Sequence, residues 1–185
     1  MAMWIWIVII AAAILLLIFV SYYNRIKVLG NRTDNSWSQI DVQLKKRVDL
    51  VPNLVETVKG YAKHEEKIMT AVTDAHKAML GAQTIAEKAE ASGVLTNALR
   101  GLLALAENYP NLKANENFRL LQEQLEGIEN KIAYARQYYN DSVLEYNNLI
   151  TTIPGVWVAG MMGKKAQKEY FKVTEAERQA PKVSF

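Results

Sequence analysis

The first twenty residues form the most apolar stretch of the chain, MAMWIWIVIIAAAILLLIFV, and carry no charged or polar side chain. A helix rises about 1.5 Å per residue, so a helical run of this length extends about 30 Å, the thickness of the hydrocarbon core of a bilayer. Aromatic residues that favour membrane interfaces flank the run on both sides: Trp4 and Trp6, then Tyr22 and Tyr23. The sequence therefore predicts a transmembrane anchor over residues 1–22.

The flanks of this run differ from those of a cleaved signal peptide. A signal peptide has basic residues before a shorter apolar run and small residues at its exit. Here no basic residue precedes the run, and the bulky Phe19 and Val20 stand at its end. We therefore expect the helix to be retained in the membrane.

The basic residues nearest to the anchor all follow it: Arg25, Lys27 and Arg32. Basic residues beside a membrane span are enriched on the cytoplasmic side. This asymmetry predicts a single-pass protein of the bacterial cytoplasmic membrane, with the N-terminus outside and the rest of the chain in the cytoplasm.

The chain beyond the anchor has the composition of one globular domain. None of the 185 residues is cysteine, which excludes disulfide and thiolate chemistry, and 22 Lys and Arg stand against 19 Asp and Glu. Because acidic and basic residues alternate, the chain lacks the basic stripe that is typical of nucleic-acid-binding proteins. We expect residues 23–36 to form a juxtamembrane linker or a continuation of the anchor helix, and residues 37–185 to form a helical bundle.

From Trp37 onward, apolar residues recur at spacings of three and four or their multiples, the pattern of an amphipathic helix. The first such helix is predicted to reach about Leu80, with apolar positions at Ile40, Leu44, Val48, Val51, Val55, Val58, Ala62, Met69 and Val72. A second helix begins between Thr84 and Ser92. It must end before Pro110, because the residue that precedes a proline is disfavoured in a helix.

The third predicted helix has a heptad seam from Phe118 to Ile153, with Tyr139 and Tyr146 as core rings. Asn115 suits its N-cap, and Pro154-Gly155 its end. A fourth helix is expected over residues 164–172, with Tyr170 and Phe171 packing back on the others. The predicted fold is all-α: an N-terminal transmembrane helix followed by an antiparallel up-and-down bundle of three or four long helices.

Three separated segments carry a resemblance to a known family: WSQIDVQLKKRVDLVPNLVETVKGYAKHE, AENYPNLKANENFRLLQEQLEGIENKIAYARQYYNDSVLEYNNLITTIP and the closing APKVSF. From about Tyr23 to Phe185 the chain resembles the LemA family of bacterial membrane-anchored proteins. The resemblance implies a transmembrane helix followed by a helical bundle, with no established activity and no catalytic residues to transfer. His76 stands where similar proteins are expected to carry arginine, which argues against an essential imidazole there.

The two histidines do not have the spacing of a metal site. His64 precedes Glu65 as in a zinc-protease helix, but that motif needs a second histidine four residues after the first, where this chain has Ile68. His76 is about 18 Å from His64 along a helix. The other candidates for acid–base chemistry are expected to lie mostly off the apolar seam, beside Lys and Arg on solvated faces: Glu56, Glu65, Glu66, Glu116, Glu123, Glu126 and Glu129. We therefore predict no catalytic residue, no metal and no cofactor.

Two groups of residues are candidates for interaction. The first surrounds a proline inside the first helix: Arg47, Asp49, Pro52 and Asn53. Because a proline frees a helix carbonyl, we interpret this group as a bend in a long helix, with a buried polar node or a partner site as the alternative. The second is the apolar loop 153–163, with Trp157, Met161 and Met162. We expect this loop at the end of the bundle away from the membrane, as a cap or a subunit contact.

The sequence thus predicts a membrane-anchored scaffold or interaction protein without catalytic activity. Its expected partners are membrane lipid, further copies of itself and an unidentified protein, but not nucleic acid. One alternative is an oligomer that shapes the membrane or organises the envelope. The alternative from another class is a hydrolase or a metal-dependent enzyme within the bundle.

Overall fold

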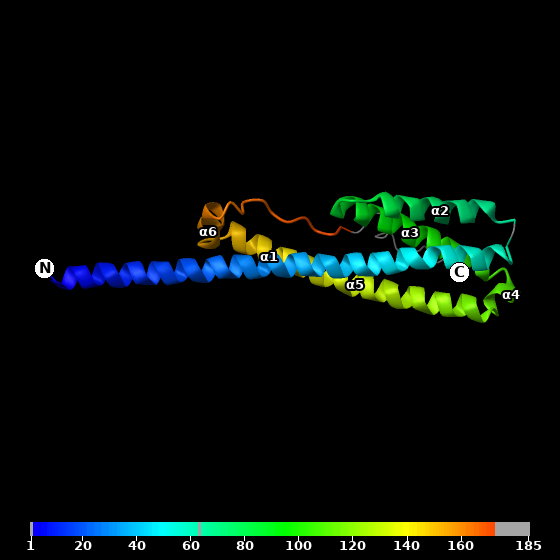
Figure 1. Cartoon of the computed structure of the whole chain (residues 1–185), viewed down its shortest axis with the longest axis horizontal. Coiled ribbons are helices and arrows are strands. Elements are labelled where there is room, and N and C mark those ends of the chain that lie inside the picture. Colours follow the sequence, from blue (N-terminus) through cyan, green and yellow to red (C-terminus); the bar gives the residue numbers. More distant parts are fainter. Residues whose placement is uncertain (1, 63, 173–185) are drawn as a thin grey trace, which may run out of the picture. The chain divides into compact units, whose positions relative to one another are not determined.

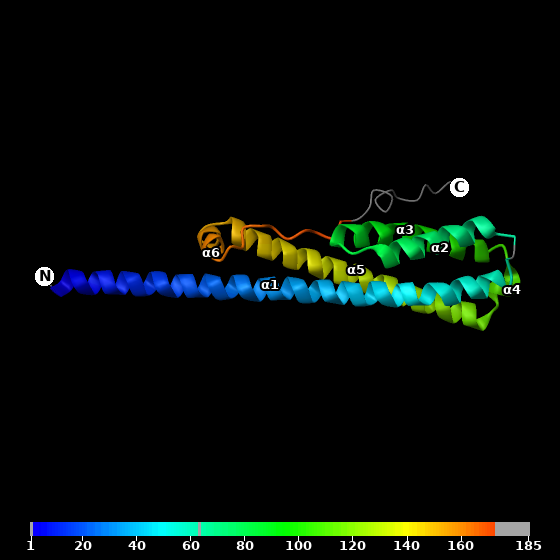
Figure 2. The ribbon, with the colours of Figure 1, turned by 45° about the horizontal axis from the view of Figure 1, so that its top comes forward.

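The computed structural model describes residues 2–62 and 64–172, so the closing APKVSF motif lies outside the described residues. Every regular element in these residues is a helix, which confirms the all-α prediction (Figures 1 and 2). The helices are α1 (Ala2–Lys59), α2 (Glu66–Gly81), α3 (Ile85–Ala106), α4 (Pro110–Lys113), α5 (Glu116–Thr151) and α6 (Gly155–Met161).

The chain divides into two compact units. Unit 1 comprises the residues up to Ser38 together with residues 137–170, and unit 2 comprises residues 39–136 with Phe171 and Lys172. Both α1 and α5 contribute residues to each unit.

Unit 2 is a four-helix arrangement of α1, α2, α3 and α5, with α4 as a single turn before α5. Asp41 of α1 pairs with Lys88 of α3, and Arg47 further along α1 bonds to Ser92, so these two helices run in the same direction. The helices α2 and α3 pack on each other across a short connection. The apolar positions predicted for the first helix are all buried: Ile40, Leu44, Val48, Val51, Val55, Val58, Ala62, Met69 and Val72.

Local capping chemistry sets where two helices begin. The Thr84 hydroxyl accepts from the backbone N–H of Glu87, and the Glu87 carboxylate accepts from the N–H of Thr84, which forms a capping box at the start of α3. The side-chain oxygen of Asn115 accepts from the N–H of Phe118 at 2.9 Å. The predicted N-cap of α5 is therefore confirmed, and the second predicted helix does end before Pro110.

The prediction of one helix from Trp37 to Leu80 is wrong. Helix α1 ends at Lys59, and the N–H groups of Tyr61 and Ala62 both bond to the carbonyl of Val58, as a turn does. Glycine disfavours a helix interior by about 1 kcal/mol relative to alanine, so Gly60 is a weak point at which the chain reverses into α2. The chain therefore reverses direction once more than the sequence pattern predicts.

Unit 1 contains the first part of α1, the last part of α5, α6 and the segment 164–170. Its core consists of Ile26, Leu29, Tyr146, Leu149, Ile150, Val158 and Ala159. Arg32 bonds to Glu145, whereas Trp37 further along α1 contacts Tyr139, so α1 and α5 are antiparallel here. Ile153, the last predicted seam residue, is instead 70% exposed because α5 has already ended at Thr151.

Residues 164–172 are not helical, contrary to the prediction of a fourth helix there. The Asn147 side chain accepts from the N–H of Lys168 at 2.8 Å and donates to its carbonyl at 3.0 Å. The Tyr139 hydroxyl donates to the carbonyl of Glu169 at 2.8 Å. Side chains of α5 thus occupy backbone groups that a helix would need for itself.

Within unit 1, α1 carries the apolar run. The most apolar 18-residue window of this helix is 0% buried, and α1 passes without interruption through residues 23–36. Surface of this length and apolarity, left uncovered by the described residues, is suited to lipid.

Candidate functional site

Arg47 is the largest fully buried side chain among the residues that the structure describes, with 1% of its surface exposed. On α1 it occupies the same heptad position as Ile40 and Leu54, seven residues away on either side, and both of these are also buried. A charged group at a core position requires polar partners, because burial of an unpaired charge is very costly. The bundle supplies these partners from α3 and α5.

The guanidinium of Arg47 forms four hydrogen bonds. Its Nη1 donates to Thr96 Oγ1 and to Glu129 Oε2, each at 2.9 Å, and its Nη2 donates to Ser92 Oγ at 2.7 Å and to the Ser92 carbonyl at 3.3 Å. The Arg47 Nε is buried without a partner. One side chain therefore links three helices of unit 2.

Thr96 and Glu129 complete the network around Arg47. The single hydroxyl proton of Thr96 can be donated to one of two acceptors, the Ser92 carbonyl or Glu129 Oε1, both at 3.0 Å. The Glu129 side chain is 41% exposed, so the negative end of the ion pair reaches solvent while the positive end does not. We name Arg47, Ser92, Thr96 and Glu129 the arginine network.

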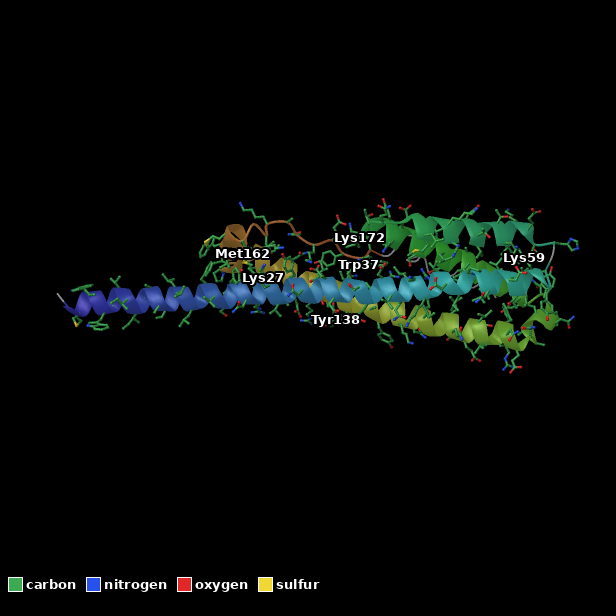
Figure 3. All side chains as sticks on the ribbon, in the orientation of Figure 1. Lys27, Trp37, Lys59, Tyr138, Met162 and Lys172 are labelled. Carbon is green, nitrogen blue, oxygen red and sulfur yellow. The ribbon has the colours of Figure 1, made fainter. Side chains whose placement is uncertain are left out.

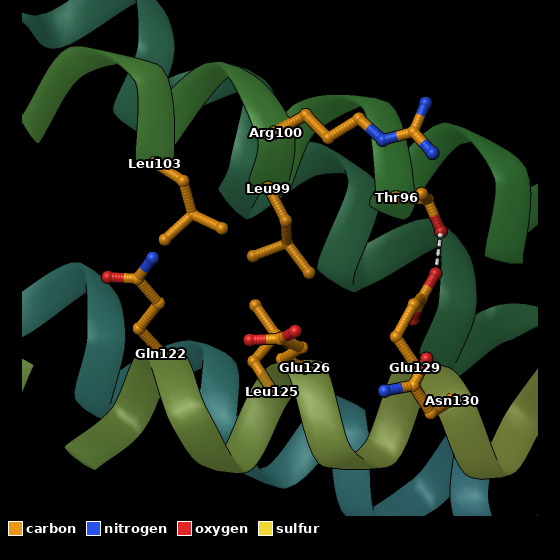
Figure 4. Close-up of a pocket in the computed structure, with 9 residues that line it drawn as sticks. All are labelled: Thr96, Leu99, Arg100, Leu103, Gln122, Leu125, Glu126, Glu129 and Asn130. Carbon is orange, nitrogen blue, oxygen red and sulfur yellow. Dashed lines mark hydrogen bonds between the residues drawn. The ribbon is translucent and has the colours of Figure 1, made fainter. Parts of the chain in front are cut away.

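A pocket of about 280 Å³ lies between α3 and α5 beside the arginine network. Leu99 and Leu103 on α3 point toward Leu125 on α5, and the Thr96–Glu129 hydrogen bond closes one end of the pocket (Figure 4). The polar lining residues are Arg100, Gln122, Glu126 and Asn130. The pocket offers an apolar floor with a polar rim, a surface on which a partner side chain can lie.

A second surface is found on α6 in unit 1. Val158 and Ala159 are buried against Ile26 and Leu29 of α1, and Met162 packs against the same cluster. Figure 3 shows Met162 beside the stretch of α1 that carries Lys27. The other face of α6 is open, with Trp157 62% and Met161 69% exposed.

Comparison with known protein families matches residues 36–185, most of the chain, to the LemA family. The chain belongs to the LemA family. This finding confirms the resemblance that was carried by the sequence motifs.

Three relatives of this LemA-family chain are magnetosome proteins by name. Magnetosome proteins MamQ 1 and MamQ 2 of Paramagnetospirillum magneticum are each 25% identical to the chain over 185 residues, and the match covers 81% of the chain and 64% of the relative. Magnetosome protein MamQ of Magnetospirillum gryphiswaldense is 25% identical over 175 residues, with 80% of the chain and 64% of the relative covered. The apolar anchor, the helical fold and these relatives together describe a membrane-associated helical protein.

The LemA-family structure separates the residues that the sequence grouped around the proline. Arg47 is buried in the arginine network, whereas Asp49, Pro52 and Asn53 are exposed on α1, which continues through Pro52 to Lys59. The sequence did not reveal the partners of Arg47, namely Ser92, Thr96 and Glu129. One available signal was the seven-residue spacing between Arg47 and the core positions on either side of it.

The apolar loop of the LemA-family chain does not lie where the sequence analysis placed it. Residues 155–161 form α6, which packs on the stretch of α1 that leaves the apolar run, and not at the end away from the membrane. The extra chain reversal at Gly60 accounts for the error, because it makes the last part of α5 antiparallel to the first part of α1, so that α6 follows beside Ile26 and Leu29.

The acid–base and metal-binding groups of the described LemA-family residues are dispersed. His64 is exposed, and His76 lies on α2. Across residues 2–62 and 64–172, no three His, Asp or Glu side chains come close enough together to hold a metal ion. The arginine network offers a fixed ion pair and two hydroxyls, of which that of Thr96 lies within hydrogen-bond distance of Glu129 Oε1.

Proposed function

We propose that this LemA-family protein is a non-catalytic, membrane-anchored scaffold that presents a helical bundle on the cytoplasmic side of the membrane and binds other proteins there, including copies of itself. One observation carries the proposal: α1 is a single helix of 58 residues that contains both the uncovered apolar run and the first buried seam of the bundle. Such a helix joins a protein-binding domain directly to the bilayer.

The surface of unit 2 supports a role in assembly. A shallow hollow of about 300 Å³ lies between the end of α2 and α3, lined by Ala78, Gly81, Ala82, Glu87, Glu90, Ala91 and Val94. Val94 is 50% exposed at this hollow, and Leu80 nearby on α2 is 65% exposed. Small side chains around an exposed valine allow close approach of another helix, and exposed apolar patches mark protein contacts.

The test compares the mass of the full-length protein in nanodiscs with that of two variants. Val94→Lys places a charge at the hollow and should shift the assembly toward the monomer. Ala104→Lys carries the same charge on the same helix, about 15 Å further along, and should leave the assembly unchanged. Equal masses for all three proteins would contradict self-association through this surface.

Cross-linking in intact cells tests the wider proposal of partner binding. A photoreactive amino acid at Tyr134, which is 75% exposed on α5, should give discrete cross-linked bands. The same group at Lys131, also exposed on α5, serves as the control for random collision. The scaffold proposal fails if every band obtained from the Tyr134 position is also obtained from the Lys131 position.

Two alternatives remain distinct from this proposal. The relatives are magnetosome proteins by name, so an assembly that shapes or organises a membrane is kept as a second function. Flotation of the protein with vesicles followed by electron microscopy would show whether it deforms them. The other alternative is an enzyme within the bundle, which would require a reactive centre. Measurement of the metal content of the purified protein would test whether such an enzyme is metal-dependent.

A further inference from the structure

Helix α6 lies beside α1 at the point where α1 leaves the apolar run. Val158 is 4% and Ala159 1% exposed, and both pack with Ile26 and Leu29. Phe19, which belongs to the apolar run, and Tyr22 pack against the same cluster. Both views of the ribbon show α6 alongside α1 at the end of α5 (Figures 1 and 2). If residues 3–20 lie in the hydrocarbon, α6 is therefore at the level of the membrane surface.

The face of α6 that is turned away from this cluster is apolar and open. Trp157 and Met161 are four residues apart on one side of the helix, and Ile153 lies in the turn that precedes it. All three are more than 60% exposed: Ile153 70%, Trp157 62% and Met161 69%. None of the described residues covers this stripe, which we name the α6 stripe.

Exposed basic side chains follow α6 and occur on the part of α1 that leaves the apolar run. Lys164 and Lys165 follow α6 and are exposed, and the Lys165 side chain lies near Gly160. Arg25 and Lys27 on α1 are also exposed. Residues 151–168 contain no acidic side chain. The arrangement combines apolar residues, a tryptophan and lysines, as in helices that lie in the interface of an anionic bilayer.

We propose that α6 is a second membrane contact, which lies in the headgroup region of the bilayer that holds the anchor, with the α6 stripe inserted at the acyl boundary. The proposal rests on the anchor of the proposed function but not on self-association. The lipid bilayer is favoured over a second copy of the chain because α6 packs on α1 beside Phe19 and Tyr22, where α1 leaves the apolar run, and because Lys164 and Lys165 follow α6 while none of residues 151–168 is acidic.

The experiment uses the full-length protein in vesicles of phosphatidylcholine and phosphatidylglycerol, with single-tryptophan variants made by Trp→Phe exchange. One variant keeps Trp157, one keeps Trp4 in the anchor, and one keeps Trp37, which packs on Tyr139 well beyond the apolar run. Lipids brominated near the headgroup end of the acyl chain quench tryptophans at the membrane boundary. We expect Trp157 and Trp4 to lose emission and Trp37 to retain it.

Each other outcome has a defined meaning. If Trp157 is not quenched but Trp4 is, the α6 contact is overturned and the anchor is left intact. If neither Trp157 nor Trp4 is quenched, the anchor is overturned, and with it the proposed function. A third outcome is that Trp157 emission is blue-shifted, is not quenched by brominated lipid, and loses its blue shift as the protein is diluted in lipid. This outcome assigns the α6 stripe to a second copy and overturns the membrane contact.

A second variant pair separates membrane contact from folding. Trp157→Ser with Met161→Ser should preserve helix content, because both side chains are exposed. It should also release the segment around α6 to added protease in vesicles. Val158→Ser, on the buried face, should instead destabilise unit 1 with or without lipid. Equal protease sensitivity of the first variant and the wild type would contradict the proposal.

Discussion

At the scale of residues, Arg47 shows how a buried charge can organise a bundle. Its hydrogen bonds reach two helices other than its own, so a shift of one helix along another would leave a charge unpaired in the core. Buried polar groups can fix the register of helices at some cost in stability. The exposed end of the pair, at Glu129, lowers this cost because its carboxylate keeps contact with water.

The arginine network predicts an asymmetry between its two charged residues. Glu129→Ala leaves a buried guanidinium without its carboxylate and should lower the free energy of unfolding by about 3 kcal/mol, the lower end of the range for broken buried pairs, because water can enter where Glu129 was exposed. Arg47→Met leaves a hydrated glutamate and an apolar side chain of similar length in the core, and should cost less than about 1 kcal/mol. Guanidinium unfolding of the full-length protein in micelles, followed by circular dichroism, checks the order. A larger loss for Arg47→Met would contradict this account.

Tyr139 predicts a loss of stability at alkaline pH. Burial, together with the charges of Glu169 and Asp34, raises the pKa of Tyr139 from its ordinary value of 10.0 to about 12. A group with a raised folded-state pKa stabilises the fold fully below its unfolded pKa, and this contribution is lost as the pH rises through the folded value. Stability should therefore fall between about pH 10 and pH 12, and Tyr139→Phe should flatten that part of the profile. Tyr134→Phe, at an exposed position, is the control and should leave the profile unchanged.

At the scale of elements, α3 begins at a capping box that involves an ionised carboxylate. The backbone N–H groups of Thr84 and Gln83 hold the pKa of Glu87 below its ordinary value of 4.5. The stabilisation that this carboxylate gives is present above pH 4.5 and is lost as the pH falls through the lowered value.

Glu87→Gln should remove this pH dependence, because the amide keeps an acceptor oxygen but does not titrate. The measurement is amide hydrogen exchange in the first turn of α3, compared between about pH 6 and pH 3. The wild type should lose protection on acidification beyond the intrinsic trend, and the variant should not. Glu90→Gln, an exposed glutamate on the same helix, should behave as the wild type.

The sequence predicts the buried faces of these elements better than their ends. Val58, Ala62, Met69 and Val72 keep helical spacing across the turn after α1, so periodicity alone gives no sign of the break at Gly60. Caps that use one local side chain, as at Asn115, are visible in the sequence. The arginine network and the position of α6 depend on contacts between distant segments, and the number of chain reversals decides which segments meet.

At the scale of the whole molecule, the orientation in the membrane is a prediction that the basic residues support. Arg25 and Lys27 are exposed just after the apolar run. Arginine is cationic at physiological pH, and a hydrogen bond to Tyr138 together with the nearby charge of Glu145 raises the pKa of Arg32 further. All three cations favour the cytoplasmic side.

Trypsin added to spheroplasts should therefore leave the bundle intact, and trypsin added to inverted membrane vesicles should cleave it at exposed sites such as Lys113 and Lys131. Immunoblotting with an antibody against the bundle reads out both arms. Cleavage in spheroplasts with protection in inverted vesicles would establish the opposite orientation.

Because α1 is continuous, its length between the apolar run and Ile26 sets the distance between the bilayer and α6. Ile26 lies six positions after Val20, and each residue added or removed between them changes the height of α6 by about 1.5 Å. A thicker bilayer covers more of α1 and draws the α6 stripe into the acyl region, whereas a thinner one leaves the stripe facing water unless the anchor tilts. If α6 contacts the membrane as proposed, the thickness of the membrane sets how much of the α6 stripe is exposed to water.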